Sequence, residues 1–179
     1  GPGRANLVVL DDGLKAFEGS EDASLREGIR RRLAYYGQYG IGVIARPRHQ
    51  PGVFVREGTK SGNWKKPSNL NYGLIFLRKM KELQALGLSP EESRNQIIAE
   101  HPEYQDALIM GDVSRGDVIL FNDADTITPR DALVKTVPAF VMEPDLAILQ
   151  HSIEAVNRGA NFCADMFGTL DEVRWQEIA

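Results

Sequence analysis

Short apolar runs alternate in this chain with longer segments of helical spacing. Residues 6–10 (NLVVL), 42–45 (GVIA) and 118–121 (VILF) have the length and composition of buried strands, and residues 146–150 (LAILQ) are a fourth candidate. Amphipathic helices instead place apolar residues three or four positions apart, as the intervening segments do. Strands that alternate with helices indicate an α/β fold, so we predict a mostly parallel sheet flanked by helices.

Helix start signals fall between these runs. The clearest lies at residues 89–92 (SPEE), where a serine N-cap, a proline at the first helical position and a glutamate three residues after the cap form a capping box. Other helices are expected over residues 25–37 with Ser24 as N-cap, over residues 69–83, and after Thr128-Pro129.

The remaining segments carry weaker signals. Residues 53–56 are a candidate for a small extra strand, and the polar residues 58–68 are expected to form a loop. Residues 82–117 resemble an insertion ahead of the strand predicted over residues 118–121. The arginines at positions 30–32 are predicted to lie on a solvated helix face, with an anion-binding patch as the less favoured alternative.

Carboxylates directly follow two of the predicted strands. Asp11 and Asp12 follow the first, and Asp123 and Asp125 follow the strand that ends at Phe121. Ligands of open α/β sheets bind outside the carboxyl ends of the strands. Crowding acids at that edge raises their pKa values unless a cation or hydrogen-bond donors compensate. Because oxygen ligands suit magnesium and manganese, the pattern predicts a divalent cation that carries a diphosphate.

A basic segment precedes the helix expected over residues 69–83. Lys66 lies just before the start of this helix, where helix N-terminal amides favour anions such as phosphate. Asn69 and Asn71 can hold the turn or reach polar groups of a ligand. The alternative is a capped helix start with solvated lysines.

Charge and cysteine content exclude several classes of function. The formal net charge of −4 argues against a general nucleic-acid binder. The one cysteine excludes an internal disulfide framework and a multi-cysteine zinc site, and the three histidines lack ligand spacing. No run of about 18 apolar residues is present, so we expect no membrane span in this chain.

Three of these segments together resemble the family 2 glycosyltransferases. The segments VVLDDG, KKPSNLNYGL and ILFNDADTITP occur in the order seen in that family, and the likeness covers roughly residues 6–151. It is nearest to the processive branch that includes cellulose, chitin and hyaluronan synthases. The resemblance implies a GT-A fold and transfer of a sugar from a nucleotide diphosphate donor, UDP-sugar by expectation, with inversion at the anomeric carbon.

The resemblance also implies roles for individual residues. Asp123 and Asp125 match the family's metal-binding pair, with Asp125 the more direct ligand of Mn²⁺ or Mg²⁺, and the cation would stabilise the leaving diphosphate as a Lewis acid. The nucleotide-sugar-binding positions implied in this chain are Asp11, Asp12, Arg46, Lys66, Asn69, Asn71 and Asp123.

The chain departs from the family pattern in three places. Only a GPG scar precedes Arg4, where the family has an additional first strand. A Thr-Glu-Asp or Ser-Glu-Asp motif, which supplies the general base in the family, does not occur. Arg174-Trp175 lacks the glutamine of the family's Gln-x-x-Arg-Trp motif and has Asp171 in its place. Because inversion needs a base for the acceptor hydroxyl, we expect the isolated chain to be inactive.

The resemblance and the departures from it together predict a partial catalytic domain. Residues 1–3 are expected to be a cloning scar, residues 4–151 the nucleotide-sugar-binding part, and residues 152–179 the start of an acceptor-side region. The expected partners are the nucleotide-sugar donor and, in the full protein, a glycan acceptor. This segment is expected to face the cytoplasm in a membrane-associated parent.

Two alternatives stay open. A nucleotidyltransferase also combines paired acids, a metal and a nucleotide, but it would carry a glycine-rich basic loop where this chain has residues 13–16 (GLKA). A non-catalytic GT-A-like interaction module would keep the fold without the chemistry. If a neighbouring strand is missing, the exposed sheet edge could also pair two copies into a homo-oligomer.

Overall fold

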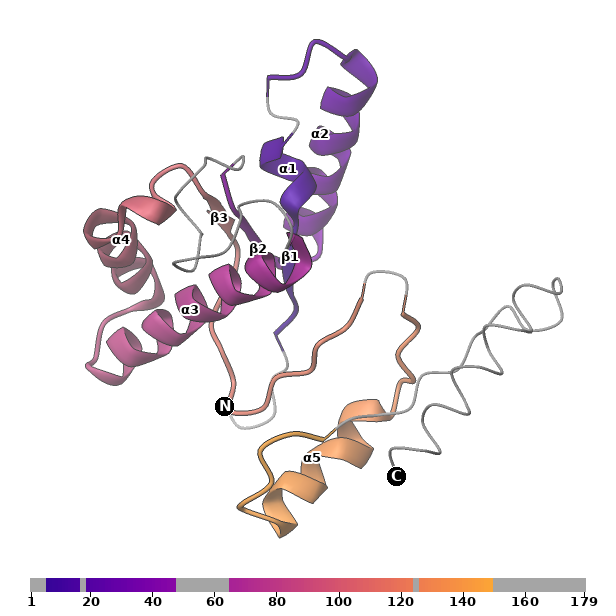
Figure 1. The fold of residues 1–179 in the computed structure, drawn as a ribbon, viewed down its shortest axis with the longest axis vertical. Helices are drawn as coiled ribbons and strands as arrows, with labels where there is room; N and C mark the ends of the chain where they lie inside the picture. The colour runs from indigo at the N-terminus through magenta and orange to yellow at the C-terminus, as the bar shows by residue number, and fades with distance from the viewer. Residues whose placement is uncertain (1–5, 17–18, 48–64, 124–125, 150–179) are drawn as a thin grey trace, which may run out of the picture. The chain divides into compact units, whose positions relative to one another are not determined.

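The computed structural model describes residues 6–16, 19–47, 65–123 and 126–149. The chain divides into two compact units, Gly1–Ile119 and Leu120–Ala179. Figure 1 shows the helices and strands of both units.

The described residues of the first unit form a small sheet of three strands in the order β1-β2-β3. The strands are β1 (Val8–Leu10), β2 (Gly42–Ala45) and β3 (Leu108–Met110). β1 pairs with β2 in parallel, whereas β2 and β3 are antiparallel. The sheet is therefore mixed, and the prediction of a mostly parallel sheet was wrong. An α/β architecture is confirmed.

The helices of this unit agree with the predicted ones in place but not always in their ends. They are α1 (Asp12–Ala16), α2 (Ala23–Gln38), α3 (Lys65–Ala85) and α4 (Pro90–Glu100), followed by the 3-10 turn η1 (Pro102–Tyr104). The capping box at Ser89 and Glu92 is confirmed, since each side chain accepts from the other residue's backbone N–H. α3 starts at Lys65, so the end of the loop predicted over residues 58–68 is helical instead.

The N-cap of α2 is Asp22 rather than the predicted Ser24. The Asp22 Oδ1 atom accepts hydrogen bonds from the backbone N–H of Ser24 at 2.8 Å and of Leu25 at 3.4 Å. Aspartate and serine are about equally good N-caps, so the local sequence did not separate them.

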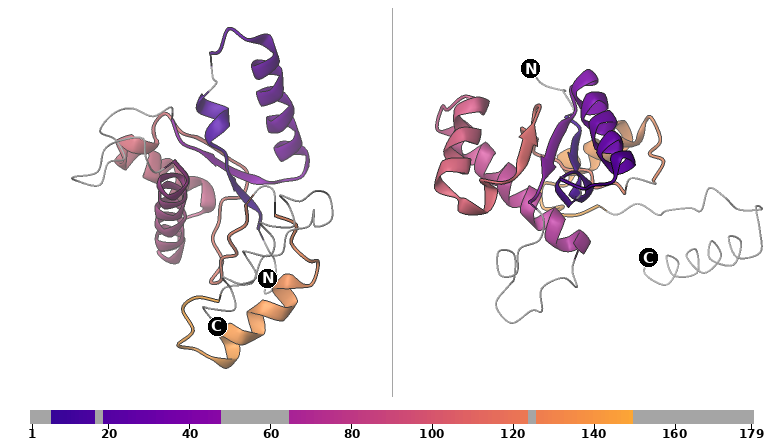
Figure 2. Two further views of the ribbon diagram at one scale, coloured as in Figure 1. Left: turned by 45° about the vertical axis from the view of Figure 1, so that its right-hand side comes forward. Right: turned by 90° about the horizontal axis from the view of Figure 1, so that it is seen from above.

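The core lies on both faces of the sheet, and β2 at its centre is fully buried. Because successive strand residues face opposite sides, Ile44 packs on one face, and Val43 and Ala45 pack on the other. Side chains of α3, α4 and η1 cover the first face, and those of α1 and α2 cover the second; Figure 2 shows the sheet between these two layers. The larger buried side chains of the first face are Tyr72, Phe76, Leu77, Met80, Ile97, Tyr104 and Val113.

One glycine sets how closely α3 approaches the sheet. A Cβ atom on Gly73 would lie 2.5 Å from the Cδ2 atom of Leu10 at the end of β1. Real Cβ atoms do not come this close to a neighbour, so the glycine holds α3 against β1. This contact places the start of α3 beside the carboxyl end of β1.

The segment predicted to be an insertion, residues 82–117, is part of the core. It contains α4, η1 and β3, and it buries Ile97, Tyr104 and Val113. The third strand of the sheet is thus Leu108–Met110, which the sequence analysis did not identify.

The strand predicted over residues 118–121 is absent: these residues are not in a strand and are 36% to 55% exposed. A strand needs a hydrogen-bonded neighbour, and among the described residues the segment pairs with neither of the two sheet edges, β1 and β3. The apolar run satisfied the composition of a strand but found no partner among the described residues.

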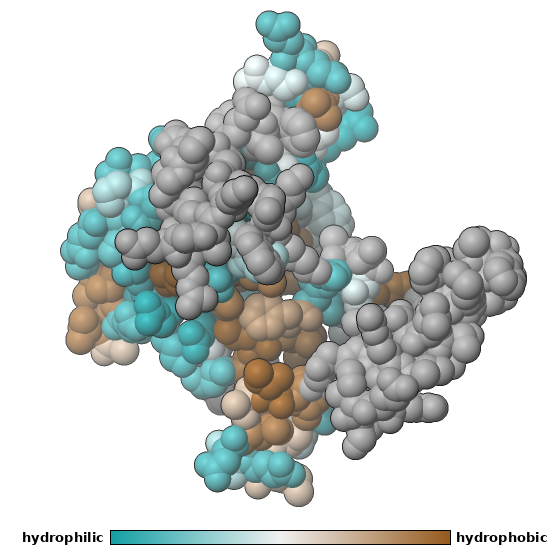
Figure 3. Space-filling view, viewed as in Figure 1, coloured by the Kyte–Doolittle hydropathy of each residue, from teal (hydrophilic) through white to brown (hydrophobic). Residues whose placement is uncertain are grey.

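The second unit contains α5 (Ala132–Met142) in its described part. Its start agrees with the prediction to within a few residues, although Asp131 at the N-cap makes no capping hydrogen bond through its side chain. Thr136 is the buried residue of α5, while Val134, Val141 and Met142 are more than 70% exposed. Figure 3 shows apolar side chains on this surface. Residues 146–149 form no strand, which corrects the fourth strand prediction.

Several predictions lie outside the described residues. These are the strand over residues 53–56, the region from 152 onward and the side chains of Lys66 and Asp125. Among the described helices, none combines the length and the apolar character needed to cross a membrane.

Candidate functional site

Asp11 follows β1 and is held by hydrogen-bond donors from two other parts of the chain. The Arg32 Nη1 atom donates to both carboxylate oxygens, at 2.9 and 2.8 Å, and the Tyr36 hydroxyl donates to Oδ2 at 3.1 Å. The backbone N–H of Gly13 donates to Oδ1 at 2.9 Å. The Asp11 side chain is 11% exposed, so this carboxylate is almost enclosed by its own partners.

Asp12, the next residue, is held by an arginine from the neighbouring strand. Arg46, which follows β2, donates from Nε to Oδ1 at 2.6 Å and from Nη2 to Oδ2 at 2.7 Å. The third nitrogen, Nη1, donates to the Ser68 hydroxyl in α3 at 2.7 Å. Such a two-pronged pair fixes both orientation and distance. The Arg46 side chain is 14% exposed, whereas that of Asp12 is 39% exposed and remains open to a ligand.

Asn69 joins the same region from the first turns of α3. Its Nδ2 atom donates to the carbonyl oxygen of Leu10, the last residue of β1, at 3.1 Å. Its Oδ1 atom is buried, and no described residue donates a hydrogen bond to it.

The parallel pairing of β1 and β2 explains this convergence. Parallel strands end at the same edge of a sheet, so Asp11, Asp12 and Arg46 leave it side by side. Gly73 lets α3 approach β1, which adds Ser68 and Asn69. We call Asp12, Arg46, Ser68 and Asn69 the strand-end cluster.

Tyr36 has a raised pKa for a definite physical reason. Burial comes first, because it disfavours the phenolate, and the neighbouring Asp11 carboxylate adds to the effect by charge and by the hydrogen bond. The Tyr36 hydroxyl therefore stays protonated and keeps donating to Asp11. Asp11 acts as an anchor between β1 and α2, and Asp12 is the acid that can meet a ligand.

The structure brings together four of the predicted site residues, namely Asp11, Asp12, Arg46 and Asn69. Asn71 is exposed on α3, and none of the hydrogen bonds of the strand-end cluster involves its side chain. The position of Lys66 is the second residue of α3.

Of the two acids predicted to bind the metal, Asp123 and Asp125, the structure describes only Asp123. Asp123 is an exposed residue of the second unit, and its carbonyl oxygen accepts from the Thr126 N–H at 3.0 Å. It does not follow a strand, which corrects the reasoning that placed it at a strand end. Asp125 is outside the described residues. Within the described ranges no group of three or more acids, histidines or cysteines is arranged to hold a metal ion.

Sequence reasoning missed Arg32, Tyr36 and Ser68. Arg30 and Arg31 are solvated as predicted and pair with Glu27, but Arg32 turns inward to Asp11. The spacing of residues along this helix could have predicted the position of Arg32. Arg32 lies on the same stripe as Ile29, Leu33 and Tyr36, and a charge on an apolar stripe needs a partner inside the fold.

Comparison of the chain with protein-family models, with curated proteins and with solved structures gives no match.

Proposed function

We propose that this chain is the donor-binding part of an inverting family 2 glycosyltransferase, and that the strand-end cluster binds the nucleotide of a UDP-sugar. The observation that supports the proposal is the convergence of Asp12, Arg46 and Asn69 at the carboxyl end of two parallel strands. This is the edge at which α/β sheets bind ligands. Asp12 and Asn69 also lie in two of the segments that resemble the family. Arg46 directly follows a strand, as the family arginine does.

The strand-end cluster offers one open carboxylate whose position is fixed by its neighbours. The partly exposed Asp12 carboxylate accepts hydrogen bonds and suits the ribose hydroxyls. Arg46 orients that carboxylate through its two-pronged pair. Asn69 fixes the first turns of α3 beside the end of β1 through its hydrogen bond to the Leu10 carbonyl oxygen.

The metal belongs to the proposal on the strength of the sequence resemblance. Asp123 and Asp125 would hold Mn²⁺ or Mg²⁺, and the cation would supply Lewis-acid stabilisation of the diphosphate. The general base for the acceptor is not identified in this chain, and the proposal is limited to donor binding.

The nucleotidyltransferase alternative is less favoured by the local structure. Such an enzyme would bind triphosphate with a glycine-rich loop after its first strand. Here residues Gly13 to Ala16 belong to α1, and the Leu14 side chain is 2% exposed in the core between α1 and the sheet. A segment packed in this way has no backbone amides arranged in an open loop.

Calorimetric titration of the chain with UDP, with and without Mn²⁺, tests the proposal. We expect saturable binding that is weakened at least tenfold by Asp12→Asn and by Arg46→Lys, because lysine keeps the charge but cannot form the two-pronged pair. Asp106→Asn, an exposed acid in the same unit, is the matched control and should bind UDP as the parent does. Absence of UDP binding by the folded chain, or equal binding by Asp12→Asn and the control, would refute the proposal.

The metal is tested separately in the same titration. Asp125→Ala should remove the enhancement by Mn²⁺ and leave the metal-free binding of UDP unchanged. Enhancement that survives in Asp125→Ala would show that this residue does not bind the cation.

A further inference from the structure

Ser68, the fourth residue of α3, joins this helix to the arginine that holds Asp12. The Arg46 Nη1 atom donates to the Ser68 Oγ atom at 2.7 Å, and Ser68 is half-buried. The Nε and Nη2 atoms of the same guanidinium donate to the two carboxylate oxygens of Asp12. One side chain therefore links a residue after β2, a residue after β1 and a helix that covers one face of the sheet.

The contact with Ser68 restricts a motion that the pair of Arg46 and Asp12 leaves open. Two parallel hydrogen bonds fix the guanidinium and the carboxylate relative to each other, but the two side chains can still swing together. Asp12 is 39% exposed, so solvent does not prevent this motion. A hydrogen bond from the third nitrogen to another element does prevent it. Arg46 is only 14% exposed, so water competes little for its donors.

The start of α3 is itself fixed to the sheet. The Asn69 Nδ2 atom donates to the carbonyl oxygen of Leu10 at 3.1 Å. Leu10 ends β1, and Asp12 begins α1 directly afterwards. The contacts thus form a closed circuit, from β1 to α3 through Asn69, from α3 to Arg46 through Ser68, and from Arg46 back to Asp12. Within this circuit the Ser68 hydroxyl is a support with a fixed position.

We propose that Ser68 is a positioning residue of the strand-end cluster. Its hydroxyl orients Arg46, and Arg46 in turn holds the open Asp12 carboxylate in the orientation that meets the ligand. The inference rests on the proposed function for the identity of that ligand, a uridine nucleotide, whereas the arrangement of the three side chains stands on the contacts alone. Ser68 acts through Arg46 and is assigned no contact with the nucleotide.

Two substitutions at Ser68 test this role in calorimetric titrations of the whole chain with UDP. Ser68→Ala removes the acceptor and should weaken UDP binding about threefold to tenfold. Ser68→Thr keeps a hydroxyl and should bind as the parent does. Ser24→Ala is the matched control, because Ser24 is an exposed serine in the first turn of α2, and it should also bind as the parent does.

A second measurement needs no ligand. The Nε–H group of Arg46 donates to the Asp12 Oδ1 atom at 2.6 Å, so its exchange with water, followed by NMR, reports how firmly the pair is held. We expect exchange to be about threefold to tenfold faster in Ser68→Ala than in the parent or in Ser68→Thr. The exchange of the β2 backbone amides should stay unchanged. A serine that only stabilised the fold would instead change both rates.

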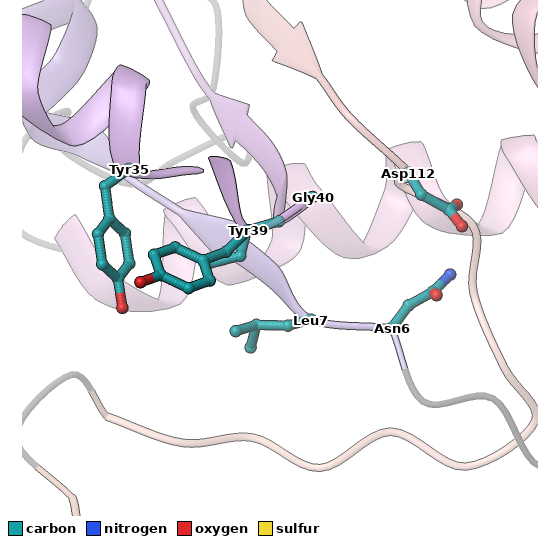
Figure 4. Close-up of a pocket in the computed structure, with 7 residues that line it drawn as sticks. Asn6, Leu7, Tyr35, Tyr39, Gly40 and Asp112 are labelled. Atoms are coloured by element: carbon teal, nitrogen blue, oxygen red, sulfur yellow. The ribbon is translucent and has the colours of Figure 1, made fainter. Parts of the chain in front are cut away.

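A cavity at the other end of the sheet provides a control for the place of binding. This cavity of about 390 Å³ lies at the amino ends of β1 and β2, and its lining includes Leu7, Tyr35, Tyr39 and Gly40. Figure 4 shows the two tyrosines side by side. Tyr39 is 60% exposed and caps α2 through its backbone, so Tyr39→Leu should fold and should bind UDP as the parent does.

The possible outcomes separate the positioning role from the proposed function. If the parent binds UDP and Ser68→Ala binds it equally well, the positioning role is overturned and the proposed function stands. If the parent binds no UDP, the proposed function fails, and the Nε–H exchange decides the role of Ser68 by itself: equal rates in the parent and in Ser68→Ala overturn it. Loss of UDP binding in Tyr39→Leu but not in Ser68→Ala would place the nucleotide in the cavity and would overturn both.

Discussion

Removal of the Asp11 carboxylate should destabilise the first unit more than any other single change to a polar side chain of its sheet edge. Asp11→Ala removes the acceptor for Arg32, for the Tyr36 hydroxyl and for the Gly13 N–H at once. Asp11 is only 11% exposed, and few water molecules can replace it. The expected loss of stability is therefore set by the three hydrogen-bond donors that lose their acceptor.

The magnitude follows from how exposed each donor is. A hydrogen bond to a charged group contributes about 1.5–3 kcal/mol when it is buried. The Arg32 side chain is 40% exposed, so its share must be reduced for solvent screening to about 1 kcal/mol. The Tyr36 hydroxyl and the Gly13 N–H contribute about 1 kcal/mol each. We expect Asp11→Ala to lower the free energy of unfolding by about 2–4 kcal/mol.

Native-state hydrogen exchange of the β2 amides measures this quantity for the first unit, because β2 is the fully buried centre of its sheet. A double-mutant cycle with Arg32→Gln isolates the ion pair, which should show a coupling energy of about 1 kcal/mol. Arg31→Gln is the matched control, since Arg31 is 78% exposed and pairs with Glu27 instead. A cost below about 0.5 kcal/mol for Asp11→Ala, or equal coupling of Asp11 to Arg31 and to Arg32, would show that the anchor role is wrong.

Four further outcomes are expected. Gly73→Ala should be less stable in urea unfolding than Gly28→Ala by about 1–3 kcal/mol. The reason is that a Cβ atom at Gly73 meets Leu10, whereas one at Gly28 meets no atom within 4 Å. Equal stabilities of the two variants would contradict the close packing of α3 on β1. Burial raises the pKa values of Tyr72 and Tyr104 above their ordinary value of 10.0, so their contribution to stability is complete below pH 10 and is lost as the pH rises above it. The tyrosinate absorbance of these two residues should therefore appear together with the loss of circular dichroism. Tyrosinate absorbance from them while the chain is still folded would contradict the raised pKa values. The chain alone should transfer no sugar from labelled UDP-sugars, and any turnover would show that it contains its own base. Among the described residues β1 is at an edge of the sheet, so light scattering should detect dimers at high concentration, and a strict monomer would rule out pairing through that edge.

The sequence by itself determined the elements that depend on neighbours along the chain. The capping box at Ser89 and Glu92 involves residues three apart, and its prediction was correct. β2 was predicted with its observed ends, and β1 was placed correctly with Asp11 and Asp12 directly after it. These patterns are local, so a single sequence carries them in full.

The tertiary structure decided which apolar run became the third strand. Residues 118–121 and Leu108–Met110 are both short and apolar, but only the second pairs with β2. That choice depends on a partner more than 60 residues away by sequence number, Val43 opposite Met110, and strand propensity cannot report it.

The tertiary structure also separated the roles of two adjacent acids. In the sequence Asp11 and Asp12 are equivalent candidates. In the fold Asp11 meets Arg32, 21 residues later, and is enclosed, while Asp12 meets Arg46, 34 residues later, and stays open. The physical reason is that an ion pair is set by which side chains the packed helices and strands bring within hydrogen-bond distance, and this distance has no counterpart in the spacing of residues along the chain.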